Sequence, residues 1–125
     1  MLAQPPLPPP ALVPPDAEVG IFWDYENQPL GKSFSEAALV CVLQRARSFG
    51  RISETRLYAD AMKADKAAFQ KHGPSLDRLG VTLVDCPTSD KKEAVDKKII
   101  VDLCCFALPR AARGLACCVL SLIHI

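Results

Sequence analysis

Acidic and amide side chains follow directly after a short apolar run near the amino end of the sequence. Val19 to Trp23 is apolar and aromatic, and Asp24, Glu26 and Asn27 come next. Polar residues that follow a buried strand of a parallel sheet lie in the crevice where such sheets bind ligands. Their oxygens suit Mg²⁺ or Mn²⁺, because hard cations take oxygen ligands. The same residues would also suit a solvated loop, so this segment alone leaves both interpretations open.

A second group of acids and bases opens a helical pattern far downstream. Its acids include Asp96 and Asp102, which lie six positions apart. At about 100° per residue this spacing separates them by about 120° around a helix. We therefore expect Asp96, rather than both, to reach a site shared with Asp24. The neighbouring bases, which could meet phosphate or form solvated Asp–Lys pairs, are Lys92, Lys97 and Lys98.

The elements that position these residues alternate between strand and helix along the chain. Strands are predicted by apolar or alternating runs at 19–23, 52–59, 81–84 and 115–120. Helices are predicted from Ser33 to Gly50, over 65–79 with a break at Gly73-Pro74, and over 92–108 with an end before Pro109. Such alternation favours βαβ units, and hence an α/β fold with a parallel sheet covered on both faces.

Composition and charge exclude several classes of protein. The chain is 50% hydrophobic and 23% charged, as in soluble globular domains, and its net charge of +1 indicates no general affinity for nucleic acid. No apolar run approaches the roughly 20 residues of a membrane span, so we expect no membrane segment. The 6 cysteines form no CxxC pair and lie in apolar runs, which predicts buried reduced thiols rather than disulfides or a zinc site.

The first residues form a proline-rich segment. Residues 1–17 hold most of the prolines and begin without lysine or arginine, so we expect an extended, disordered tail and no secretory signal. Proline-rich tails also bind proline-recognising modules, which makes a protein partner the functional alternative.

Together these segments resemble a known family, the NYN domain. The resemblance rests on Val19-Gly20-Ile21-Phe22-Trp23-Asp24-Tyr25-Glu26-Asn27 and on the later Lys92, Asp96 and Asp102, and it is strongest to the limkain (meiosis regulator and mRNA stability factor) type. It implies a PIN-like three-layer sandwich and a ribonuclease that uses Mg²⁺ or Mn²⁺. It further implies that Asp24 and Asp96 bind metal, with Asp102 a further catalytic member and Asn27 shaping the site beside Glu26.

One departure from the family pattern concerns the carboxyl end. The family continues after its fourth strand with a Ser-Gly-Asp-x-Asp-Phe type of segment, whereas this sequence ends in Leu-Ser-Leu-Ile-His-Ile. One frame of a common transposon-end sequencing adapter would encode those six residues. We therefore expect a partial NYN domain at 18–119, incomplete at its C-terminus, and a non-native tail at 120–125.

The functional expectation is a metal-dependent RNA nuclease in RNA turnover and regulation of gene expression. RNA is the expected partner, with Lys92, Lys97 and Lys98 on its backbone, while the oligomeric state stays open. The alternative is a non-catalytic RNA-binding or scaffold module, because the missing carboxylates could leave this chain inactive. A haloacid-dehalogenase-like phosphatase is disfavoured, since Asp24 is not followed by the Asp-x-Asp pattern. The cytoplasm is the expected location, with peroxisomes suggested by family association alone.

Overall fold

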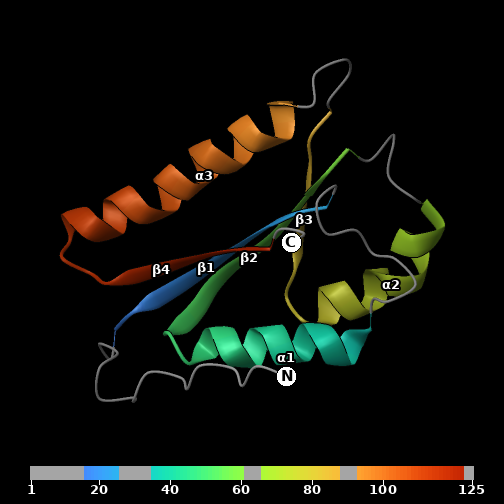
Figure 1. Cartoon of the computed structure of the whole chain (residues 1–125), viewed down its shortest axis with the longest axis horizontal. Coiled ribbons are helices and arrows are strands. Elements are labelled where there is room, and N and C mark those ends of the chain that lie inside the picture. Colours follow the sequence, from blue (N-terminus) through green and yellow to red (C-terminus); the bar gives the residue numbers. More distant parts are fainter. Residues whose placement is uncertain (1–15, 26–34, 61–65, 88–92, 123–125) are drawn as a thin grey trace, which may run out of the picture.

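The computed structural model of the chain describes residues 16–25, 35–60, 66–87 and 93–122, and strands alternate with helices along it (Figure 1). The strands are β1 (Glu18–Asp24), β2 (Arg51–Ala59), β3 (Thr82–Asp85) and β4 (Cys117–Leu122). The helices are α1 (Glu36–Arg47), α2 (Lys66–Arg78) and α3 (Glu93–Ala112). The predicted strand and helix order is confirmed.

The four strands form one sheet in the order β3-β2-β1-β4, and every neighbouring pair is parallel. In this register Asp24 of β1 lies opposite Tyr58 of β2, and Ala59 of β2 lies opposite Asp85 of β3. Because all strands run the same way, these carboxyl ends lie at one edge of the sheet. The predicted parallel α/β sheet is therefore confirmed.

Helices cover both faces of the sheet and give three layers (Figure 1). Alternate residues of β1 point to opposite faces, as a strand requires. Val19, Ile21 and Trp23 join the core under α1 and α2, whereas Phe22 joins the core under α3. Burial of both faces explains why β1 is a continuous apolar run rather than an alternating one.

A glycine allows α3 to lie close to β1. A Cβ atom on Gly20 would come within 2.8 Å of Phe22 Cε2 and 3.0 Å of Phe106 Cε1. The two phenylalanine rings meet edge to face, with centroids 5.9 Å apart. Gly20 thus leaves the space that this aromatic contact fills.

Both predicted proline breaks are wrong. Helix α2 continues through Pro74 and α3 continues through Pro109. The end of α3 is set by Gly114, whose φ of 72° favours glycine. The Gly114 and Leu115 N–H groups donate to the Ala111 and Arg110 carbonyls at 3.0 and 2.9 Å, so they satisfy the last turn.

The start of α1 differs slightly from the sequence prediction. The helix begins at Glu36 with Ser35 as its N-cap, and the Ser35 hydroxyl accepts a 3.1 Å hydrogen bond from the Ala38 N–H. Ser33, the predicted start signal, lies outside the described residues. Ser35 can take the capping role because its side-chain oxygen satisfies an N–H that has no partner within the helix.

The cysteine prediction holds only in part. The cysteines whose side chains the structure describes are free thiols, but only Cys86 is buried, while Cys41, Cys104 and Cys105 are exposed. The last three lie on outward helix faces, which an apolar neighbourhood in sequence does not reveal. Among the described residues, no helix combines the length and the apolar character that crossing a membrane requires.

Candidate active site

Aspartates mark the carboxyl ends of three neighbouring strands. Asp24 ends β1, Asp60 comes directly after β2, and Asp85 ends β3. Asp24 and Asp60 are buried, whereas Asp85 is exposed. Sequence reasoning selected only Asp24, although Asp60 and Asp85 carry the same signal, an aspartate at the end of a strand-forming run. The sheet therefore presents an acidic edge, defined by Asp24, Asp60 and Asp85.

Asp24 is 5% exposed, which is unusual for a carboxylate at a strand end. It lies two residues after Phe22, so strand alternation directs it to the face that α3 covers. Burial is the main cause that raises the pKa of the Cys86 thiol; the positive charge of Lys98 lowers it in part, and the negative charges of Asp85, Asp102 and Asp24 raise it further. Asp24 and Asp102 therefore act electrostatically on the same buried thiol.

Asp102 lies within an ionic network between α3 and β2. Its carboxylate accepts a 2.8 Å hydrogen bond from the Tyr58 hydroxyl, and it lies 3.2 Å from both the Arg56 guanidinium and the Lys98 ammonium group. Burial works to raise its pKa, but the Tyr58 and Lys98 hydrogen bonds and the two positive charges outweigh burial and lower it. Asp102 is thus held as a carboxylate that already has three partners.

Asp96 occupies a different face of α3. The inward face consists of Val95, Ile99, Asp102 and Phe106, all buried. Asp96 directly follows Val95 in the sequence but does not belong to this inward face, and it is exposed. Helix α3 begins at the end of the sheet where β3 stops, so its first turns lie at the acidic edge (Figure 1). The structure places Asp96 near the amino end of α3 and Asp102 on its buried face; the metal role of Asp96 and the catalytic role of Asp102 stay predictions.

The remaining predicted site residues divide into two sets. Lys97 and Lys98 are exposed on α3, and Lys98 pairs with Asp102 four residues later. Glu26, Asn27 and Lys92 lie outside the described residues. Exposure leaves Lys97 accessible to a ligand, whereas Lys98 would have to share its charge with Asp102.

The aromatic residues beside Asp24 have distinct environments. Trp23 is 3% exposed and packs in the core under α1 and α2, so it is a structural residue. Tyr25 is only partly buried, and its ring meets that of Phe69 on α2 with centroids 5.0 Å apart. The aromatic pair therefore follows Asp24 in the sequence but lies on the α2 side of the sheet, whereas Asp24 is directed to the α3 side.

A comparison with protein families identifies this architecture. The family model described as the NYN domain matches residues 18–121, most of the chain. The chain belongs to the NYN domain family. NYN domains are generally associated with RNA nuclease activity, and nucleases of this PIN-like kind typically use divalent metals. A search of the curated proteins finds no match.

The acidic edge of this NYN domain has the donor chemistry of a hard cation site. Carboxylate oxygens are the ligands that Mg²⁺ and Mn²⁺ prefer, and magnesium is commonly held by only one or two carboxylates with water and substrate phosphate. Within the described ranges, no three His, Cys, Asp or Glu side chains gather closely enough to hold an ion. Asp24, buried at the strand end, fits a site of the sparse magnesium kind.

Proposed function

We propose that this NYN domain is a divalent-metal-dependent ribonuclease of the limkain type, acting in RNA turnover and in regulation of gene expression. The observation that carries the proposal is Asp24, a buried carboxylate at the carboxyl end of β1 in a chain that belongs to this family. Carboxylate oxygens are the ligands that Mg²⁺ and Mn²⁺ prefer, and one or two of them with water and substrate phosphate commonly hold magnesium. The cytoplasm is the proposed location, where substrate RNA is available.

The proposal assigns roles to particular side chains. Asp24 and Asp96 would hold Mg²⁺ or Mn²⁺, which when bound supplies an activated water and charge stabilisation for phosphodiester hydrolysis. Asp102 keeps Lys98 and Arg56 in place below the site through its ion pairs. Lys97 attracts the RNA backbone by charge, together with Lys92 and, in part, Lys98. The proposed specificity is for phosphodiester backbone rather than for one sequence.

A non-catalytic RNA-binding module is the second candidate. The observation that favours it is that the Asp102 carboxylate already interacts with Tyr58, Arg56 and Lys98. A carboxylate with three partners has less capacity left for a metal ion. In this alternative the fold and the basic residues retain RNA, and no bond is cut.

The two candidates are separated by incubating labelled RNA with the chain and Mn²⁺. A nuclease cuts RNA with Mn²⁺, stops when the metal is chelated, and loses activity in Asp24→Asn. The matched control is Asp77→Asn, which makes the same change at an exposed aspartate of α2. RNA retention without cleavage in Mn²⁺ would instead support the binding module.

Metal binding can be measured without any cleavage. A bound ion that does not bind the unfolded chain raises the melting temperature as its concentration rises. We expect Mn²⁺ to raise the melting temperature of the wild-type chain and of Asp77→Asn, but not that of Asp24→Asn. Equal stabilisation of all three chains would contradict a metal site at Asp24.

A further inference from the structure

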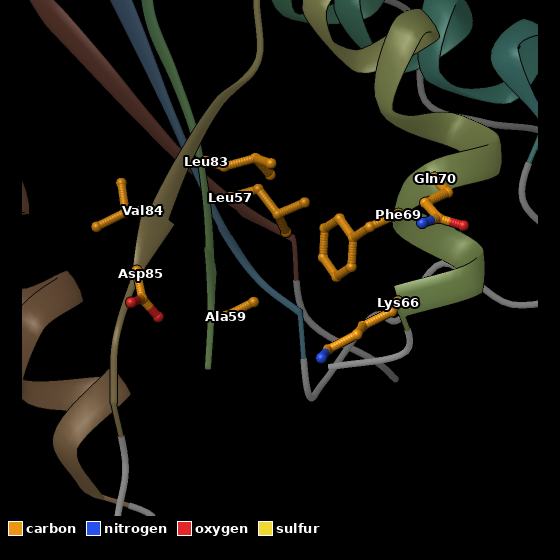
Figure 2. A pocket seen from close by; sticks show the side chains of 8 residues that line it. All are labelled: Leu57, Ala59, Lys66, Phe69, Gln70, Leu83, Val84 and Asp85. Atoms are coloured by element: carbon orange, nitrogen blue, oxygen red, sulfur yellow. The ribbon is translucent and has the colours of Figure 1, made fainter. Parts of the chain in front are cut away.

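A pocket lies beside the acidic edge, between α2 and the carboxyl halves of β2 and β3 (Figure 2). Its volume is about 430 Å³, within the range of about 300–1,000 Å³ that small-molecule sites span. The floor is apolar and is formed by Leu57, Ala59 and Leu83. Leu83 is 52% exposed, so part of this floor faces solvent.

One wall of the pocket is an aromatic ring. Phe69 projects from α2 toward Leu57 and Ala59, while Leu57 and Leu83 point toward it from the strands (Figure 2). A flat ligand inserted here would have the ring on one side and aliphatic side chains on the other. Such a slot suits a nucleobase, because every base has a π-face that stacks on aromatic side chains.

The rim of the pocket is polar. Lys66 and Gln70 of α2 line it and are exposed, and Asp85 lines it from the end of β3. The Lys66 ammonium group can pair with a phosphate, and the Gln70 amide carries both hydrogen-bond donors and an acceptor for a base edge. The polar rim thus complements the phosphate and the base edge of a nucleotide, whereas the apolar floor complements the face of its base.

The pocket lies at the same carboxyl edge of the sheet as the candidate active site. Phe69, its aromatic wall, contacts Tyr25 with ring centroids 5.0 Å apart, and Tyr25 directly follows Asp24. Asp85 belongs both to the pocket rim and to the acidic edge. An RNA strand with its backbone at the acidic edge therefore has a place for a neighbouring base on the α2 side of the same edge.

We propose that this pocket binds one nucleobase of a single-stranded RNA, stacked on Phe69, with a phosphate of the same strand at Lys66. The inference rests on the proposed function, because it gives the RNA substrate a base subsite next to the site of cleavage. Single-stranded RNA is the substrate form, since a base within a duplex cannot enter the slot. Apolar floor and amide rim together predict tolerance for different bases.

The test uses RNA oligonucleotides in which 2-aminopurine replaces one base at successive positions. Binding is measured on the full chain carrying Asp24→Asn, which keeps the RNA intact. At one position the 2-aminopurine fluorescence is expected to fall on binding, because the probe stacks on Phe69. Adding Phe69→Leu should abolish this change and weaken binding by about 5- to 150-fold, the range that loss of one base–aromatic stack produces.

A matched control separates stacking from general damage to the core. Phe49, like Phe69, is a partly buried phenylalanine packed against the core that Val19 and Leu39 belong to, but it does not line the pocket. Phe49→Leu should leave both affinity and fluorescence change intact. Equal losses in Phe49→Leu and Phe69→Leu would overturn the inference.

A second pair of variants does not depend on an aromatic core position. Leu83→Glu places a negative charge on the exposed floor of the pocket, and Leu108→Glu makes the same change on α3, where Leu108 is 66% exposed. Only Leu83→Glu should weaken RNA binding. If both variants bind RNA as the parent chain does, the pocket takes some other ligand and the inference is overturned.

Cleavage by the wild-type chain distinguishes this inference from the function on which it rests. RNA cutting with Mn²⁺ that is insensitive to Phe69→Leu and Leu83→Glu would overturn the base pocket and leave the nuclease proposal standing. A wild-type chain that neither binds nor cuts RNA would overturn both. RNA binding without cutting, but with the expected position-specific fluorescence change, would support the pocket in the binding-module alternative.

Discussion

The Tyr58 hydroxyl donates a 2.8 Å hydrogen bond to the Asp102 carboxylate, and this bond joins the centre of the sheet to α3. Tyr58 lies opposite Asp24 in the register of β1 and β2, so the bond is made from the strand position beside the candidate active site. Burial and the hydrogen bond to Asp102 both raise the Tyr58 pKa, so the phenol stays protonated and remains a donor. The Tyr58–Asp102 hydrogen bond thereby holds α3, the helix that carries Asp96, against the sheet.

Removing the Tyr58 hydroxyl should destabilise the fold. In Tyr58→Phe the buried Asp102 carboxylate loses one hydrogen bond, and bonds to charged groups contribute about 1.5–3 kcal/mol. Urea unfolding should show a loss of that size. As a control, Glu36→Gln breaks the exposed pair with Arg78, for which about 0–1 kcal/mol is expected. Equal losses in the two variants would contradict a structural role for Tyr58–Asp102.

The stability of the protein should fall in acid partly through Asp102. Its pKa is below the ordinary value of 3.8 in the folded chain, so the folded state favours the charged form. That contribution is present in full above the unfolded pKa and is lost as the pH falls through the folded pKa.

The stability advantage of the wild type over Asp102→Asn should therefore shrink as pH falls from 6 to about 3. Urea unfolding of both chains across that range measures the difference. The stability of Asp102→Asn should still fall somewhat in acid, because the pKa of Glu18 is also lowered in the folded chain. A difference between the chains that does not change with pH would exclude Asp102 as the titrating group.

The two aspartates of α3 should respond differently to amide substitution. Asp96 is exposed, so Asp96→Asn should change the free energy of unfolding by less than about 0.5 kcal/mol. If Asp96 holds metal as proposed, RNA cleavage should fall by at least about 10-fold, since even residues that only support metal ligands have effects of that size. Cleavage assays beside unfolding curves make the comparison. Unchanged cleavage in Asp96→Asn would remove this residue from the site.

A methyl group at position 20 should disturb the contact between β1 and α3. The added Cβ of Gly20→Ala would lie 3.0 Å from Phe106, and overpacking of this kind costs about 1–3 kcal/mol. The cost should be smaller when measured in a Phe106→Leu background, which opens space beside residue 20. A double-mutant cycle by urea unfolding gives the coupling, and additive losses would show that Phe106 does not limit this position.

The thiols should differ in their rate of alkylation. Cys41, Cys104 and Cys105 are exposed and should react with iodoacetamide in the folded chain. Cys86 is buried, and burial is the main cause that raises its pKa, so little of the reactive thiolate forms. Mass spectrometry of digested samples over time resolves each site. Early modification of Cys86 without unfolding would contradict its burial.

Most of the fold was predictable because its signals are local. The apolar run at 19–23 predicts a strand, and the structure extends it by one residue at each end to Glu18–Asp24. The continuation of α2 and α3 beyond their prolines was not predictable in the same way. A proline removes one hydrogen bond, but Leu76 beyond Pro74 is buried in the core, and this tertiary contact favours the continuous helix.

The site was less predictable than the fold because it depends on which face of an element a side chain occupies. Asp24 could be selected from its place after an apolar strand. To predict the contacts of Asp102, one would have to know which residues of α3 face the sheet. Its partners Arg56 and Tyr58 lie 46 and 44 residues away in the sequence. The pocket was not predicted at all, since Phe69 reads from the sequence as an ordinary core residue of a helix.

The sheet order has a consequence for synthesis of the chain. β1, the first of the described strands in chain order, pairs on one side with β2 and on the other with β4, the last of them. One edge of β1 therefore stays open until residues 117–122 leave the ribosome. Open apolar edges attract other strands, so nascent chains of this protein should be most exposed to aggregation and to chaperones in that interval.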